Sequence, residues 1–232
     1  ETDIYLARLD ATGDITGTPQ NLTGAWNRDP GGITWSSNSN LIRFSAQING
    51  NSHLFEVHRD QGSVTQVTLG DRRLSSFSFT ENGSHMAYTA TDAVTPAEVF
   101  VSRTGDGSNE VQLTNFNGEW LSERTVNPAE RITWMVEDGT EIEGWVIKPV
   151  GYEEGTSYPI IMKIHGGPHS YYGNTWFQAF HVFSASGFFV FYPNPRGSSS
   201  YGNDFTYATR GKWGVMDEED FMTGLDTVLE AY

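Results

Sequence analysis

The sequence predicts a mixed fold, in which blades of a β-propeller are followed by the first part of an α/β unit. Three observations support this prediction. Strand-like phrases recur about every 45 residues in the first half, an Asp-Gly hairpin follows them, and apolar strands alternate with amphipathic helices in the second half. We therefore expect a partial propeller over residues 1–125 and an α/β part over residues 126–232.

The first half contains two interleaved phrases. One phrase, a short strand followed by a turn and a polar strand, occurs three times around Tyr5, Leu54 and Val99, which are 49 and 45 residues apart. The other, a strand, a polar turn and a second strand, occurs at 33–44 and again at 77–88. Four short strands per period are typical of propeller blades, and a blade needs neighbours to bury both faces. Because only two to three blades fit here, we expect the chain to start inside a larger propeller.

The second half begins with a hairpin and continues as alternating strands and helices. The segments 131–137 and 140–147 flank Asp138-Gly139, which predicts a two-residue turn with positive φ. Apolar segments 159–164 and 188–192 predict buried strands, with a helix between them and another after Asp217. A strand–helix–strand–helix order predicts a parallel pair joined by a crossover.

Caps and apolar periodicity define the two helices. We expect Asn174 or Thr175 to cap the first helix and Gly187 to end it. Its core face is predicted to contain Trp176, Phe177, Phe180 and Phe183. The core face of the last helix is predicted to contain Phe221, Met222, Leu225, Val228, Leu229 and Tyr232.

Composition excludes several classes of function. The formal charge is −15 and no Lys/Arg cluster is present, so binding to nucleic acid or to an anionic membrane is not expected. The chain has no Cys, which excludes disulfides, thiolate catalysis and Cys-bound zinc. There is no run of 18 apolar residues that predicts a transmembrane helix. A cytoplasmic location is expected, and a periplasmic or secreted one stays an alternative.

One motif carries chemistry: His165-Gly166-Gly167-Pro168 directly follows a predicted buried strand. Two consecutive glycines permit backbone conformations that are closed to other residues and allow a ligand to approach closely. The alternative is a tight loop that only turns the chain.

The context of this motif resembles the acylaminoacyl-peptidase-like branch of the prolyl oligopeptidase family of serine peptidases (S9). The resemblance rests on 158–168, on Asn194-Pro195-Arg196-Gly197-Ser198, and on Gly211-Lys212-Trp213-Gly214 with Asp217 and Asp220. It implies the C-terminal blades of a propeller followed by the N-terminal part of an α/β-hydrolase fold. It also implies a Gly167 N–H in the oxyanion hole, a loop shaped by Gly166, and His165 either donating or supporting the loop.

The resemblance further implies a serine-type peptidase, acting on short peptides by acyl transfer without metal or other cofactor. The family's nucleophile motif, Gly-x-Ser-x-Gly, does not occur in these 232 residues. We therefore expect an internal fragment that lacks the whole triad and is inactive alone, with a complementary fragment or a second copy as a possible protein partner. The alternatives are a carboxylesterase and a non-catalytic peptide-binding propeller module.

Three further groups of side chains have competing interpretations. His165 and His169 are separated by Gly-Gly-Pro, which forbids a helix, so a zinc pair is not expected. The acidic run 217–220 is expected to complement a helix dipole, with a cation site as the alternative. Arg196 has two possible roles: contact with a substrate carbonyl or carboxylate, or an ion pair that ties its loop to a neighbouring acid.

Overall fold

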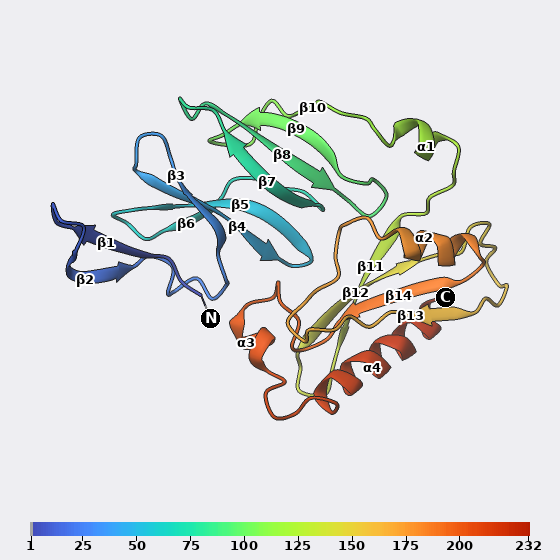
Figure 1. The fold of residues 1–232 in the computed structure, drawn as a ribbon. Helices are drawn as coiled ribbons and strands as arrows, with labels where there is room; N and C mark the ends of the chain where they lie inside the picture. The colour runs from blue at the N-terminus through green and yellow to red at the C-terminus, as the bar shows by residue number, and fades with distance from the viewer. Residues whose placement is uncertain (1) are drawn as a thin grey trace.

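The computed structural model describes residues 2–232 and arranges them as two sheet-rich parts (Figure 1). The first part contains ten strands and a short helix. These are β1 (Tyr5–Leu9), β2 (Ile15–Asn21), β3 (Gly31–Trp35), β4 (Leu41–Ile48), β5 (Asn51–His58), β6 (Val64–Gln66), β7 (Arg73–Phe79), β8 (His85–Thr91), β9 (Glu98–Arg103), β10 (Val111–Gln112) and α1 (Gly118–Ser122). The second part contains β11 (Ala129–Met135), β12 (Glu141–Ile147), β13 (Ile160–Met162), α2 (Gln178–Ala185), β14 (Phe189–Asn194), α3 (Asn203–Tyr207) and α4 (Met216–Ala231).

The strands of the first part form two four-stranded antiparallel units, β3–β6 and β7–β10, beside the separate hairpin β1–β2. The two units meet at one parallel pair, Ser52 with Arg73. The copies of each repeated sequence segment form equivalent strands. The copies around Tyr5, Leu54 and Val99 form β1, β5 and β9, and the copies at 33–44 and 77–88 form β3–β4 and β7–β8. The sheets do not close into a ring within residues 2–232, as expected for a partial propeller.

Alternating side chains pack the units against one another. Leu54 and Phe55 are adjacent on β5 and therefore point to opposite faces. Phe55 joins a cluster with Phe44 that faces the β1–β2 hairpin, and the two rings stack at 5.9 Å. Leu54 joins a second cluster with Leu74 and Tyr88 of the next unit. The β3–β6 unit is thus packed on both faces, by the β1–β2 hairpin on one side and by the β7–β10 unit on the other.

The second part is a four-stranded sheet in the order β11-β12-β14-β13, in which only β13 and β14 run parallel. Helix α2 covers one face and α4 the other (Figure 1). Neighbouring residues on β12 alternate between them, because Trp145 belongs to the core cluster under α2 and Val146 to that under α4. The predicted parallel pair with a helical crossover is confirmed.

The Asp-Gly hairpin is present, but its turn is longer than predicted. Val136 and Thr140 pair with each other (N–O 3.1 Å), which leaves Glu137, Asp138 and Gly139 as a three-residue loop. Of these residues only Gly139 has a positive φ, +82°. The prediction of a two-residue turn was wrong, because a type I turn closed by one left-handed glycine also connects two strands.

The predicted cap of the first helix was also wrong. Helix α2 begins at Gln178, with Phe177 at the N-cap and no side-chain cap. The Asn174 side chain instead donates to Asn51 Oδ1 of the first part (2.8 Å). Phe180 is buried and Phe177 and Phe183 pack beside it, whereas Trp176 lies outside that cluster and stacks on His181.

The core face of α4 is rotated from the predicted one. Its buried residues are Asp220, Gly224 and Val228, while Met222 and Leu229 are exposed. Gly224 lies against Trp134, whose ring would come within 2.4 Å of an added Cβ. The apolar pattern failed here because a buried carboxylate and a glycine, which hydrophobicity cannot identify, occupy the contact face.

Backbone contacts join the two parts. The β4–β5 turn places Gly50 (φ +74°) against the Trp145 ring, where an added Cβ would lie 2.5 Å from a ring carbon. Ser200 Oγ accepts the Gly50 N–H (2.9 Å), and Asn203 N–H bonds Asn27 Oδ1 (3.0 Å). The boundary between the parts at residues 125/126 stays a prediction.

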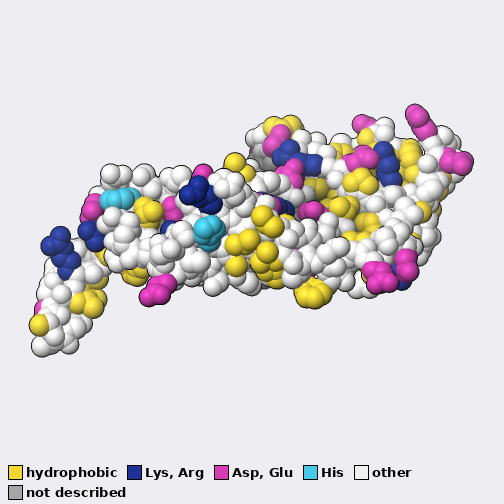
Figure 2. All heavy atoms as spheres, turned by 90° about the horizontal axis from the view of Figure 1, so that it is seen from above, with side chains coloured by type: hydrophobic (Ala, Val, Ile, Leu, Met, Phe, Trp, Pro, Cys, Tyr) yellow, Lys and Arg dark blue, Asp and Glu magenta, His cyan; other side chains and the backbone are white. Residues whose placement is uncertain are grey.

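The surface is charged with both signs. On the face in Figure 2, acidic side chains are spread over its length, with Lys and Arg side chains set singly among them. None of the helices in residues 2–232 is both long and apolar enough to span a bilayer.

Candidate active site

The predicted motif lies where two parallel strands end. Because β13 and β14 run in the same direction, the loops after them leave the same edge of the sheet. His169 Nδ1 lies 3.0 Å from Gly197 O, and Ser199 N–H donates to Ser170 O at 3.0 Å. The loop carrying His165-Gly166-Gly167-Pro168 is therefore held directly against the loop that carries Arg196.

Gly167 has a conformation and surroundings that only glycine tolerates. Its φ is +137°, and an added Cβ would lie 2.9 Å from His169 N. Gly166 differs, since nothing lies within 4 Å of an added Cβ, so the space beside it is open. Within residues 2–232, no acceptor is found for the N–H of Gly167, and this residue is exposed. The loop thus carries a backbone N–H that has no acceptor in residues 2–232 and lies in an exposed residue.

The imidazole of His165 is fixed by the second loop. Its Nε2 lies 3.0 Å from Ser198 Oγ, and its Nδ1 lies 3.2 Å from Gly166 O. Ser198 Oγ is also 2.7 Å from Pro195 O, a carbonyl that only accepts. A neutral ring carries one N–H, so two arrangements satisfy these contacts. In one, Nδ1 donates to Gly166 O and Ser198 donates to Nε2; in the other, Nε2 donates to Ser198 Oγ and Ser198 donates to Pro195 O. Burial lowers the pKa of His165, which favours the neutral ring at physiological pH.

A buried polar group, to which the sequence analysis assigned no role, connects the same loops. Asn194, at the end of β14, is fully buried and accepts the Tyr172 N–H at 2.7 Å. Its amide donates to Tyr172 O (2.8 Å) and to the Tyr201 hydroxyl (2.7 Å). Tyr201 in turn donates to Glu143, which is paired with Arg131. An amide at the end of a buried strand is the sequence feature that could have identified this group.

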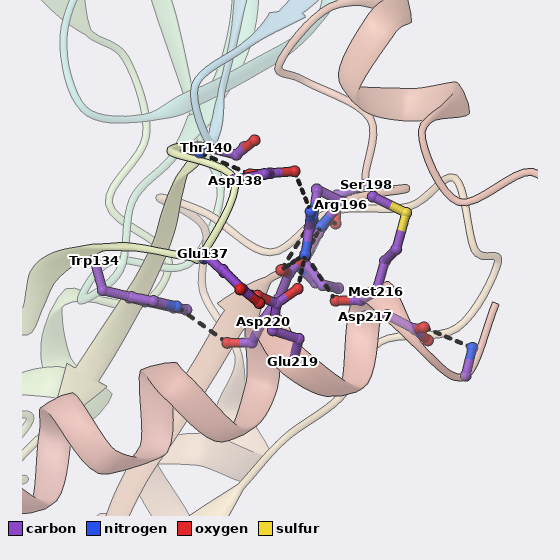
Figure 3. Close-up of polar contacts among 12 residues, drawn as sticks. Trp134, Glu137, Asp138, Thr140, Arg196, Ser198, Met216, Asp217, Glu219 and Asp220 are labelled. Carbon is purple, nitrogen blue, oxygen red and sulfur yellow. Dashed lines mark hydrogen bonds and ion pairs between the residues drawn. The ribbon is translucent and has the colours of Figure 1, made fainter. Parts of the chain in front are cut away.

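Arg196 lies in a buried ionic network (Figure 3). Its side chain is 4% exposed, and that of Asp220 is 0% exposed. Arg196 Nη2 and Nε donate to Asp220 at 2.7 and 3.0 Å, and the Arg196 backbone N–H also donates to this carboxylate (2.6 Å). Nη1 pairs with Asp138 at the hairpin turn and Nη2 with Glu219, each at 2.6 Å.

Of the two roles left open for Arg196, the ion pair with neighbouring acids is therefore present. Burial alone would lower the pKa of this guanidinium, but the hydrogen bonds to Asp220 and Glu219 raise it above its ordinary value. A contact with substrate stays a prediction.

A cation site is the alternative interpretation of the acidic run 217–220. The Asp217 carboxylate accepts the Gly214 N–H (2.6 Å), and residues 2–232 contain no group of three His, Asp or Glu side chains arranged to hold a metal.

Comparison with known proteins identifies the family. The uncharacterized peptidase YuxL of Bacillus subtilis is 34% identical over 196 residues, covering 84% of this chain and 29% of that protein. A family model described as the prolyl oligopeptidase family matches residues 174–232. The chain belongs to the prolyl oligopeptidase family. Dipeptidyl-peptidase 5 of Arthroderma otae is a more distant relative, 26% identical over 205 residues, with 87% of this chain and 28% of that protein covered.

Solved structures of this family share the fold. An acylaminoacyl peptidase in complex with Z-Gly-Gly-Phe-chloromethyl ketone superposes with a TM-score of 0.81 at 25% identity, covering 93% of this chain and 33% of that one. The uncomplexed acylaminoacyl peptidase of Pyrococcus horikoshii gives the same TM-score at 24% identity, over 99% of this chain and 34% of that one. The chain therefore combines β-propeller and α/β-hydrolase structure, and it spans about a third of the length of the proteins it matches.

Proposed function

We propose that the natural protein carrying these residues is a serine-type peptidase of the acylaminoacyl, dipeptidyl or oligopeptidase type, and that the loop after β13 forms half of its oxyanion hole. The observation that carries the proposal is the Gly167 N–H, which has no acceptor in residues 2–232 and is held at the edge where two parallel strands end. The family membership of the chain supports the same activity.

The proposed mechanism assigns the chain a defined part of acyl transfer. A serine hydroxyl attacks the peptide carbonyl carbon while a histidine takes its proton, and negative charge develops on the carbonyl oxygen. The Gly167 N–H donates to that oxygen as the charge develops. The histidine then protonates the leaving amine, and water hydrolyses the serine ester. These 232 residues contain no Gly-x-Ser-x-Gly, so the proposal places the triad outside them.

Two charged or polar clusters position this loop. His165 supports it through Ser198, and Arg196 anchors the neighbouring loop to α4 through Asp220. We assign both residues positioning roles, since the Arg196 side chain is 4% exposed and its donors are engaged by acids.

A serine-reactive fluorophosphonate tests the proposal. We expect the full natural protein to be labelled on one serine and to hydrolyse a peptide anilide, while residues 1–232 alone do neither. Hydrolysis of esters but not anilides would instead identify a carboxylesterase. Peptide binding without labelling would identify a non-catalytic module, and turnover by residues 1–232 alone would refute the assignment of the triad.

The oxyanion role has its own test in the natural protein. Gly167→Ala should lower kcat/KM at least 100-fold, mostly through kcat, because one oriented donor is typically worth roughly 3–4 kcal/mol in the transition state. Gly105→Ala is the control, since Gly105 has open space around it in the β9–β10 turn. A kcat unchanged in a folded Gly167→Ala variant would contradict the role.

A further inference from the structure

The interface between the two parts contains a pocket of about 230 Å³. Gly166 does not line this pocket, which is therefore distinct from the open space beside that residue. The first part contributes Arg28, Asp29 and Gln47 to its lining, and the second part contributes His169 and Ser199 among others. At about 30 Å³ per water, the pocket has room for roughly eight waters, or for one small group of a ligand.

Arg28 brings to this pocket, which Asp29 also lines, a guanidinium with no direct partner in residues 2–232. Within residues 2–232, its guanidinium has no hydrogen-bond or ion-pair partner, although the side chain is partly buried. Burial lowers the pKa of this guanidinium. Guanidinium groups removed from water are normally paired, because an unpaired buried charge is costly. An anion in the pocket would supply the missing partner.

A second donor without a partner lies in the same pocket. The hydroxyl of Ser199 is buried and has no hydrogen-bond partner within residues 2–232. Buried hydroxyls are rarely left unsatisfied. Because this oxygen is buried, the Ser199 side chain would have to rotate to donate to a carboxylate held by Arg28.

The backbone beside Arg28 is anchored and therefore pre-organised. Asn27 has φ +54°, and both its Oδ1 and its carbonyl oxygen accept the Asn203 N–H, at 3.0 and 3.2 Å. Gly202 permits this approach, because an added Cβ would lie 3.1 Å from Asn27 O. Asp29, the acid in the pocket, is engaged by the Thr2 N–H at 2.6 Å. The loop thus holds Arg28 at the interface before any ligand binds.

The pocket is close to the candidate oxyanion donor. His169, which lines it, is two residues after Gly167, so their Cα atoms are at most about 7.6 Å apart. A group bound at Arg28 would therefore place neighbouring peptide atoms beside the loop at which hydrolysis is proposed.

We propose that this pocket binds a carboxylate of a peptide ligand and that Arg28 is its recognition residue. The planar guanidinium matches a carboxylate with two parallel hydrogen bonds. The description of that peptide as a substrate rests on the proposed function; the binding of the carboxylate does not. The carboxylate comes either from the C-terminus of the peptide or from an Asp or Glu side chain.

Calorimetric titration of the full natural protein with three small probes tests the site without requiring catalysis. N-acetylalanine carries a terminal carboxylate, N-acetylaspartic acid α-amide carries only a side-chain carboxylate, and N-acetylalaninamide carries neither. We expect at least one acid to bind ten-fold or more tightly than the neutral amide, and the preferred acid identifies the source of the carboxylate.

Matched variants assign this preference to Arg28. Arg28→Met should abolish it and Arg28→Lys should reduce it, whereas Arg8→Met, which removes an exposed charge on β1, should leave it intact. Melting temperatures of the variants confirm that they are folded. Equal affinity for acid and amide, no binding of any probe at 10 mM, or an unchanged preference in Arg28→Met would overturn the proposal. Failure of fluorophosphonate labelling would instead refute the peptidase function and leave these titrations unaffected.

Discussion

Asp220 offers the sharpest test of how the loop after β14 is held. We consider Asp220→Asn, which keeps the shape of the side chain and removes its charge. This carboxylate accepts from the Arg196 backbone N–H (2.6 Å), from Nε (3.0 Å) and from Nη2 (2.7 Å), and it is fully buried. Removing one partner of a buried pair typically costs about 3–5 kcal/mol, because the other charge stays buried.

The expected loss lies at the lower end of that range, about 3 kcal/mol, since Asp138 and Glu219 still contact Arg196. For a chain of this length, such a loss lowers Tm by roughly 6–12 °C. Urea denaturation followed by tryptophan fluorescence measures it. The control is Asp60→Asn, in an exposed pair with Arg59 at 3.5 Å, for which we expect about 0.5 kcal/mol or less.

A double-mutant cycle separates the ion pair from other effects. Arg196→Met combined with Asp220→Leu should destabilise less than the sum of the single variants, because no buried charge is left without its partner. A loss below about 1 kcal/mol for Asp220→Asn, or strict additivity in the cycle, would refute the argument that this pair anchors the loop.

Two further predictions concern other buried positions. Burial lowers the pKa of His53 to about 4, so the unfolded state binds a proton first as pH falls, and stability is lost between the unfolded pKa near 6.5 and about 4. Between pH 7.5 and 5, the free energy of unfolding measured by urea titration should fall by about 2 kcal/mol more for the wild type than for His53→Gln. Parallel pH profiles of this free energy in the two proteins would contradict the prediction. Gly50→Ala should lower the free energy of unfolding by about 2 kcal/mol, measured by thermal unfolding, because its Cβ would lie 2.5 Å from Trp145. Gly105→Ala is the control and should be near neutral, since nothing lies within 4 Å of its added Cβ. Equal effects of the two substitutions would show that the interface rearranges to accept the new methyl group.

The predictions from sequence succeeded where a periodic pattern dictates the structure. The phrases around Leu54 and Val99 became equivalent strands, β5 and β9, because alternation of apolar side chains fixes which face of a strand is buried. The Asp138-Gly139 pair correctly placed a turn, but its length depended on the pairing of Val136 with Thr140, which a dipeptide does not encode.

The candidate site was predictable only in part. Consecutive glycines after an apolar strand identified the loop at Gly167, since few residues other than glycine adopt its positive φ. The strand itself, β13, lies at the edge of its sheet and is half-buried, whereas a buried strand was predicted. The partners of Arg196 were not predictable, because Asp138 and Asp220 are 58 and 24 residues away in sequence. Hydrophobic periodicity likewise could not show that Asp220 lies on the buried face of α4.

The sequence by itself determined the two kinds of structure, the order of their main strands and helices, and the position of the glycine loop, because these follow from local periodicity and from glycine conformations. Tertiary structure alone decided which charges are paired. Arg196 is neutralised by acids from a hairpin and a helix, while Arg28, a residue of the same type, faces a pocket without a partner in residues 2–232. Charge pairing depends on distances of a few ångströms between segments far apart in the chain, and only the packing of the two parts sets those distances.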